Sequence, residues 1–144
     1  MPATSSWLRA RPASSRRSAG WGLIPDAGGT WLLPRLVGEA RARGLTLLGE
    51  RITASQAEAW GLIWRCVDDD RLLPEAIATA EQLAQGPTHR LALIKQALNA
   101  SAGNSLDDQL RLESRLQQTA GRTDDYLEGV RAFQEKRAPR FRGT

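Results

Sequence analysis

A glycine-rich stretch early in the chain constrains its fold more than any other feature. It reads Gly22-Leu-Ile-Pro-Asp-Ala-Gly-Gly-Thr-Trp-Leu-Leu-Pro-Arg35. Gly28 and Gly29 are adjacent, and glycine allows backbone geometry that other residues rarely adopt and lets another group approach the backbone closely. The apolar residues that follow predict a helix running towards Val37. We therefore expect a tight turn that opens a helix, with the carboxylate of Asp26 just before the turn.

The sequence leaves two interpretations of Asp26 open. The first amides of a helix have no partners inside the helix, so a nearby carboxylate can cap the helix or tie down the turn. Alternatively, Asp26 is a positioned acid or base that faces a ligand lying over the glycines. The spacing alone favours the structural interpretation, because Asp is a common turn residue.

Length and composition exclude several classes of protein. A chain of 144 residues is long enough for one domain with a buried core, and 41% of its residues are hydrophobic. The sequence contains no apolar run long enough for a transmembrane helix. A single cysteine excludes an internal disulfide framework. One cysteine and one histidine also supply too few of the usual ligands for a zinc site within one chain. The single cysteine fits a reducing compartment.

The net charge of +4 comes from the N-terminal segment. Residues 1–20 contain four arginines and no acidic residue, and subtracting these four from 20 basic residues leaves 16 against 16 acidic ones. The rest of the chain is therefore neutral, which argues against a nucleic-acid binder with a basic stripe.

Residues 1–20 are rich in Ser, Arg, Ala and Pro, and this composition predicts disorder. An organelle transit peptide is an alternative, although the segment shows little amphipathic pattern. A third possibility is an out-of-frame stretch or a misplaced start.

The remainder predicts about seven helical pieces and at most one or two short strands. Thr53-Ala-Ser-Gln56 has the spacing of a capping box, and Ser105 and Thr123 are further predicted helix caps. After the first helix, the predicted elements are helices at 39–48, 53–61, 72–85, 88–100, 105–120 and 123–136 and a strand at 63–67.

Three motifs give the chain a family resemblance. They are Gly22-Leu-Ile-Pro-Asp-Ala-Gly-Gly-Thr30, Gly49-Glu-Arg-Ile-Thr-Ala-Ser-Gln-Ala-Glu-Ala-Trp-Gly-Leu-Ile63 and Gly129-Val-Arg-Ala-Phe-Gln-Glu-Lys-Arg137. In this order and at this spacing, they resemble motifs of the enoyl-CoA hydratase/isomerase (crotonase) superfamily. Trp31-Leu-Leu-Pro-Arg35, Ala59-Trp-Gly-Leu-Ile-Trp64 and Ala120-Gly-Arg-Thr-Asp-Asp-Tyr126 look like one branch, the ring-1,2-epoxyphenylacetyl-CoA isomerases of aerobic phenylacetate degradation.

The resemblance implies an α/β crotonase fold, of which this chain is the mostly helical C-terminal half. It divides the chain into a non-family segment at 1–20, part of the core with the aspartate turn at 21–67, and a helical trimerisation region at 68–144. Helix faces normally covered by the other half should then expose apolar side chains and favour aggregation.

The resemblance also implies an activity. Asp26 would shuttle a proton on the acyl group of a CoA thioester, in ring-epoxide isomerisation and in related double-bond shifts. The two glutamates of the hydratases and both amides of the oxyanion hole would lie upstream of Gly22. We therefore expect little or no activity from this chain alone, since losing one oxyanion donor costs about 100- to 1,000-fold in rate.

Further site residues come from the same resemblance. Gly28, Gly29 and Trp31 would contact the substrate, and Phe133 and Lys136 would bind the adenine and phosphate of CoA, although a packing Phe and a solvated Lys are equally compatible with the sequence. No metal and no cofactor is expected, because CoA is part of the substrate. The complete protein would be a cytoplasmic trimer or hexamer that binds neither nucleic acid nor membrane.

Two alternatives remain open at this stage. The first is another crotonase activity, either enoyl-CoA hydratase or Δ3,Δ2-enoyl-CoA isomerase of fatty-acid oxidation. The second is a helical assembly module without catalysis.

Overall fold

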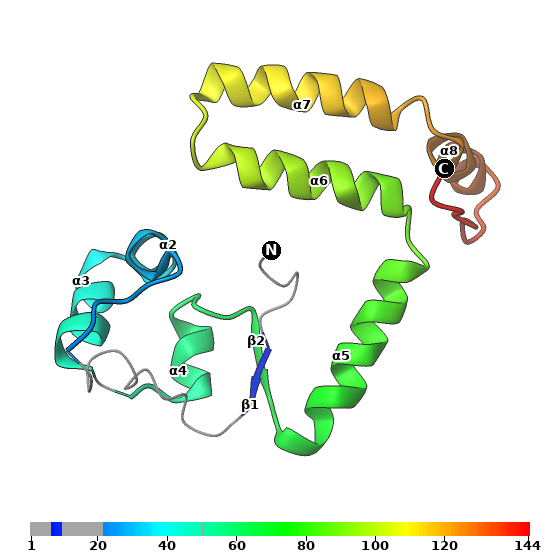
Figure 1. Ribbon diagram of the computed structural model, residues 1–144. Coiled ribbons are helices and arrows are strands. Elements are labelled where there is room, and N and C mark those ends of the chain that lie inside the picture. Colours follow the sequence, from blue (N-terminus) through cyan, green and yellow to red (C-terminus); the bar gives the residue numbers. More distant parts are fainter. Residues whose placement is uncertain (1–6, 10–21, 50) are drawn as a thin grey trace. The chain divides into compact units, whose positions relative to one another are not determined.

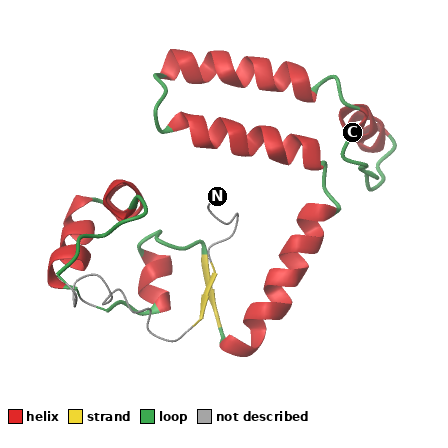
Figure 2. Ribbon diagram, viewed as in Figure 1, coloured by secondary structure: helices red, strands yellow, loops and turns green. Residues whose placement is uncertain are grey.

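The computed structural model describes residues 7–9, 22–49 and 51–144. The chain divides into two compact units, Met1–Ala76 and Ile77–Thr144. The boundary between them falls inside a helix, and the division at residue 67 that the family resemblance implies stays a prediction. Over the described residues the regular structure consists of seven α-helices, one π-helical turn and two short strands (Figure 1 and Figure 2). The expectation of a mostly helical chain is confirmed.

In the first unit, the glycine-rich stretch opens a helix as predicted. Helix α2 (Gly29–Val37) ends at Gly38. The following predicted helix is α-helical over α3 (Glu39–Arg43) and π-helical over η1 (Gly44–Leu48). At this change the Thr46 hydroxyl donates to the carbonyl oxygen of Ala42 at 2.8 Å. A side-chain donor of this kind competes with the backbone for a helical carbonyl.

Helix α4 (Ala54–Ala59) begins with the predicted capping box. The Thr53 N–H donates to Gln56 Oε1 at 2.9 Å, and the Gln56 N–H donates to Thr53 Oγ1 at 3.1 Å. The core of this unit is formed by Ile52, Ala57 and Ile63. Partly buried side chains pack against them: Leu45, Trp60, Leu62 and Cys66.

The two strands pair with each other although they lie far apart in the sequence. Strand β1 (Trp7–Arg9) runs parallel to β2 (Arg65–Val67), with Trp7 opposite Arg65. The predicted strand at 63–67 is confirmed over its last three residues. The prediction of disorder across residues 1–20 is wrong for Trp7–Arg9, because a distant partner strand supplies the backbone hydrogen bonds that local composition cannot reveal. Residues 1–6 and 10–20, to which the same prediction applied, lie outside the described residues.

Helix α5 (Asp69–Ala84) begins three residues before the predicted start at Leu72. Asp69 and Asp70 occupy its first turn instead of preceding it, where carboxylates are stabilised by the helix dipole. Glu75 accepts from Arg71 at 2.5 Å and from Arg65 at 3.1 Å, which links the start of α5 to β2.

The second unit is entirely helical over its regular part. Helices α6 (Thr88–Ser101) and α7 (Leu106–Ala120) lie side by side as an antiparallel pair (Figure 1). Ser105 caps α7 by accepting from the Asp108 N–H, and Thr123 caps α8 (Asp124–Gln134) by accepting from the Tyr126 N–H, as predicted. Helix α8 was expected to reach Lys136, but its last helical residue is Gln134.

Apolar side chains are widely exposed, as expected for a chain that resembles part of a larger fold. The buried hydrophobic residues among those described are mostly small, and none of the large side chains is fully buried. Leu47 is 77% exposed and Leu106 74% exposed. Among the described residues, no helix is both long and apolar enough to span a membrane.

Candidate functional site

The Asp26 turn has the geometry that the glycines predict. The Gly29 N–H donates to the carbonyl oxygen of Asp26 at 2.8 Å. Between them, Ala27 has a φ of 50° and Gly28 a φ of 83°, so two left-handed residues follow each other. Gly28 then forms the N-terminal cap residue of α2, and its carbonyl oxygen accepts from the Leu32 N–H at 2.9 Å.

The side chain of Asp26 does not hold this turn together within the described part of the chain. Helix α2 has no side-chain cap hydrogen bond, and no described residue donates to the Asp26 carboxylate. The carboxylate is exposed, so its oxygens remain available to another molecule. Of the two interpretations that the sequence left open, capping is therefore not supported by the structure.

The two glycines serve the turn itself. Gly28 needs its left-handed conformation, and a Cβ atom built on Gly29 would lie only 3.2 Å from Pro25 Cβ. Their predicted role in contacting a substrate stays a prediction.

Trp31 and Trp60 differ in their surroundings. Trp31 is 47% exposed, and the Arg35 guanidinium stacks 3.7 Å from the centroid of its ring. Trp60 packs against the core of the first unit, with Arg41 at 5.1 Å from its ring centroid. Trp60 is therefore a packing residue, whereas Trp31 presents about half of its surface.

Phe133 and Lys136 lie at the end of α8 in the second unit, while Asp26, Gly28, Gly29 and Trp31 lie in the first. Phe133 is 85% exposed, so it is not a core residue of the described chain. Lys136 is exposed and has a φ of 54°. No described acidic residue forms an ion pair with its ammonium group.

A carboxylate and a guanidinium that the sequence analysis missed lie beside this pair. Arg137 Nη1 and Nη2 donate to the two carboxylate oxygens of Glu128 at 2.6 and 3.0 Å. This bond, followed by one from the Arg140 N–H, lowers the pKa of Glu128 from its usual 4.5 to about 2. The hydrogen bonds of Arg137 to Glu128 and then to Glu135 raise the pKa of Arg137. Glu128 and Arg137 are nine positions apart, which is not the spacing of a helical side-chain pair, so this pair could not be predicted from the sequence.

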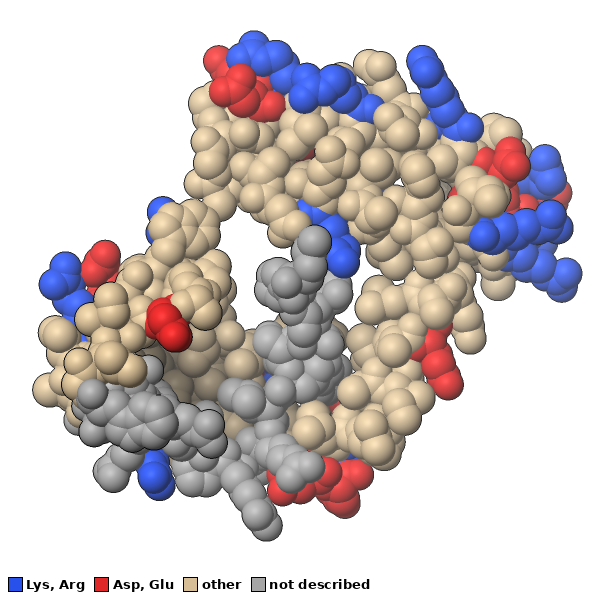
Figure 3. All heavy atoms as spheres, in the orientation of Figure 1, with Lys and Arg blue, Asp and Glu red and all other residues tan. Residues whose placement is uncertain are grey.

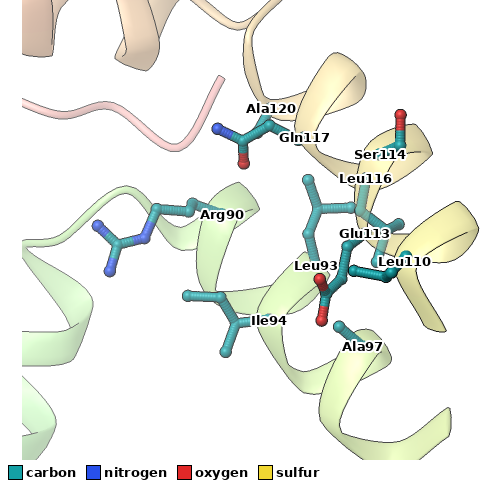
Figure 4. A pocket seen from close by; sticks show the side chains of 10 residues that line it. All are labelled: Arg90, Leu93, Ile94, Ala97, Leu110, Glu113, Ser114, Leu116, Gln117 and Ala120. Atoms are coloured by element: carbon teal, nitrogen blue, oxygen red, sulfur yellow. The ribbon is translucent and has the colours of Figure 1, made fainter. Parts of the chain in front are cut away.

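The second unit also contains two apolar grooves. One, of about 540 Å³, lies between α6 and α7, with Ile94 and Leu110 in its wall (Figure 4). The other, of about 500 Å³, is lined by Tyr126, Phe133 and Phe141.

Other candidate residues have ordinary environments. His89 is exposed, and Cys66 is partly buried in β2 against the core. In the part of the chain that the structure describes, no group of three His, Cys, Asp or Glu side chains could hold a metal ion.

Known proteins similar to this chain carry the names of isomerases and of hydratases. A family model described as "Enoyl-CoA hydratase/isomerase" matches residues 10–144. The match begins inside the segment at 1–20 that was expected to lie outside the family. A "1,2-epoxyphenylacetyl-CoA isomerase" of Escherichia coli (strain K12) is 57% identical over 122 residues, covering 85% of this chain and 47% of its own length. A "Probable enoyl-CoA hydratase" of Rhodobacter capsulatus is 50% identical, with 85% and 48% covered.

A solved structure has the same fold. The crystal structure of a probable enoyl-CoA hydratase/isomerase from Mycobacterium abscessus matches with a TM-score of 0.88 and 32% identity, covering 99% of this chain and 56% of that one. The chain spans about half the length of the curated relatives it matches.

Proposed function

Because the chain belongs to the enoyl-CoA hydratase/isomerase (crotonase) family and has the crotonase fold, we propose a specific enzyme for it. The chain is the C-terminal half of an acyl-CoA isomerase of aerobic phenylacetate degradation. The complete enzyme converts ring-1,2-epoxyphenylacetyl-CoA to oxepin-CoA and moves the double bond of 3-enoyl-CoA esters to position 2. Its similarity to a protein named 1,2-epoxyphenylacetyl-CoA isomerase supports this choice of substrate.

One observation carries the proposal: the Asp26 carboxylate is exposed beside the glycine turn and has no hydrogen-bond donor among the described residues. A carboxylate that stabilises nothing locally is free to act as a base. A proton next to a thioester carbonyl becomes removable when the enolate that forms is stabilised. Asp26 takes this proton from one carbon of a 3-enoyl-CoA, and returns it two carbons away, so the double bond moves and the carboxylate is regenerated.

Ring-epoxide rearrangement uses the same acyl pocket. The exposed face of Trp31 contributes an aromatic wall for a phenyl-derived ring. Phe133 packs on the adenine of CoA and Lys136 binds a phosphate, which fits the exposure of both side chains.

The chain needs the other half of the fold for activity. The family resemblance places both amides of the oxyanion hole in that half, and neither Gly28 nor Gly29 replaces them. No separate cofactor takes part, because CoA belongs to the substrate. The complete protein assembles as a trimer or as a dimer of trimers in the cytoplasm.

Water addition is the second candidate, since the Rhodobacter capsulatus relative carries the name of a hydratase. It requires the two glutamates that the resemblance places upstream of Gly22. A further candidate is assembly without catalysis, which the exposed apolar side chains favour. Mixing this chain with an intact relative and measuring the size of the product tests that candidate; failure to co-assemble removes it.

A chimera decides between the two reactions. The N-terminal half of the Escherichia coli relative is joined to this chain, and the product is assayed with the epoxide thioester, a 3-enoyl-CoA and a 2-enoyl-CoA. We expect isomerisation of the first two substrates to exceed hydration of the third. Hydration as the dominant reaction would contradict the isomerase assignment.

A further inference from the structure

Lys136 adopts a backbone conformation that normally belongs to glycine. It follows the end of α8 with a φ of 54°, while its N–H donates to the Phe133 carbonyl oxygen at 3.2 Å. The Arg137 N–H donates to the Ala132 carbonyl oxygen at 3.0 Å. These two bonds are those of a Schellman motif, in which glycine is preferred at the position of Lys136 because a Cβ atom is strained there.

A side chain kept at a strained position must be held by its surroundings. The next residue, Arg137, is fixed at three points: its two Nη atoms bind Glu128, and its Nε donates to Glu135 Oε2 at 2.5 Å. A planar guanidinium that binds a carboxylate through two parallel bonds has little freedom to rotate. Because Arg137 directly follows Lys136, fixing Arg137 restricts the backbone angles of Lys136.

The tail after Arg137 is fixed by the same face of α8. The Arg140 N–H donates to Glu128 Oε1 at 2.8 Å. Farther on, the N–H groups of Arg142 and Gly143 donate to the buried carboxylate of Asp125 at 2.7 and 2.8 Å. Residues 137–144 therefore form a strap that folds back along α8 (Figure 1).

Acidic and basic side chains accordingly alternate over α8 and the strap, as the right-hand side of Figure 3 shows. Among these side chains, Arg137 pairs with Glu128 and with Glu135. The ammonium group of Lys136 pairs with no described acidic residue. The strain at Lys136 is therefore not explained by an internal ion pair of the described chain.

We infer that Glu128 is a positioning residue. Through Arg137 it keeps Lys136 left-handed, three residues after the exposed Phe133. The nature of the ligand rests on the proposed function: the ring and the cation would together receive the adenine and a phosphate of CoA. The positioning itself is a property of this chain and does not depend on that ligand.

The test uses the full 144-residue chain and compares two substitutions that each remove one carboxylate charge. Glu128→Gln breaks the strap at Arg137, whereas Glu39→Gln removes an exposed ion pair with Arg43 in the first unit. The backbone φ of Lys136 is measured by NMR from its amide coupling and Cα chemical shift, and the exchange rate of the Arg137 and Arg140 amides is measured alongside.

We expect a positive φ at Lys136 in the unsubstituted chain and in Glu39→Gln. In Glu128→Gln the coupling should shift to an average over other conformations, and both amides should exchange about two- to fivefold faster, as expected for the loss of an ion pair. A Lys136 that stays left-handed in Glu128→Gln, with unchanged exchange, would overturn the positioning role. A general loss of folding would instead raise the exchange rates of amides throughout the chain. Glu128→Asp, which keeps the charge, then distinguishes the two cases, because it should partly restore the coupling at Lys136 alone.

A separate readout isolates the ligand. Binding of CoA and of dephospho-CoA to the same variants is measured by calorimetry, and Glu128→Gln should lose an expected preference of about tenfold for CoA. The φ of Lys136 could change in Glu128→Gln while the affinities for CoA and dephospho-CoA stay the same, or the unsubstituted chain could bind both ligands equally. With either result the CoA role in the proposed function fails while the positioning role stands.

Discussion

The N–H of Gly29 binds the backbone carbonyl of Asp26 at 2.8 Å, so Asp26 holds the start of α2 through its main chain and leaves its carboxylate unused. A catalytic base in a tight turn must combine a fixed backbone with a free side chain. This arrangement meets both conditions, and it separates what Asp26 does for folding from what it is proposed to do in catalysis.

Replacing the Asp26 side chain should therefore leave the chain stable. Asp26→Asn removes a carboxylate that caps nothing, and the free energy of unfolding should change by less than about 0.5 kcal/mol. Thr53→Ala is the contrasting variant, because it removes a capping box and should cost about 1 kcal/mol. Thermal unfolding measures both, and equal losses would show that the Asp26 carboxylate has a structural role.

The turn should depend on the conformation of Gly28. Gly28→Ala places a side chain on a residue with a φ of 83°, and we expect a loss of about 1 kcal/mol or more. Gly44→Ala is a matched control, because Gly44 has a right-handed φ of −57° and open space around a built Cβ. Gly44→Ala should leave the free energy of unfolding, measured with denaturant, unchanged or raise it. A Gly28→Ala variant that is equally stable would contradict the observed turn.

The strap should be tied down chiefly by Asp125. Asp125→Ala leaves the N–H groups of Arg142 and Gly143 without their acceptor, which should cost about 2 kcal/mol. Asp124→Ala, at an exposed position in the first turn of α8, should cost less than about 1 kcal/mol. Carboxypeptidase digestion, combined with thermal unfolding, would detect release of the tail; equal resistance of both variants would contradict the anchoring.

Acid should weaken the strap in a defined pH range. The pKa of Glu128 is about 2 in the folded chain and 4.5 normally, so its ionised form is favoured by folding. This stabilisation is complete above pH 4.5 and is lost as the pH falls towards 2. The difference in melting temperature between the unsubstituted chain and Glu128→Gln should shrink over that interval; a difference that stays constant from pH 6 to pH 2.5 would contradict it.

Local signals in the sequence predicted much of this structure. Thr53, Ser105 and Thr123 were identified as caps because a capping hydrogen bond joins residues three apart. The glycine turn was predictable because glycine allows backbone geometry that other residues rarely adopt. The start of α5 was misplaced because acidic residues suit both the position before a helix and its first turn.

Contacts between distant residues escaped prediction. The pairing of β1 with β2 and the bonds from Glu128 to Arg137 join residues whose spacing matches no regular repeat. The left-handed Lys136 was also missed, because the residue expected there is glycine. Whether Asp26 caps the helix could not be read from its spacing, since both roles place a carboxylate before the turn.

The most direct test of the account is the rate at which a chimera of this chain with the N-terminal half of the Escherichia coli relative isomerises a 3-enoyl-CoA, with and without Asp26→Asn. We expect Asp26→Asn to lower the rate by about 100- to 10,000-fold, and Asp107→Asn, an exposed aspartate in α7, to leave it unchanged. We also expect no measurable turnover by the 144-residue chain alone. An Asp26→Asn chimera as fast as the unsubstituted one, or rapid turnover by the chain alone, would contradict the role assigned to this carboxylate and its dependence on the other half of the fold.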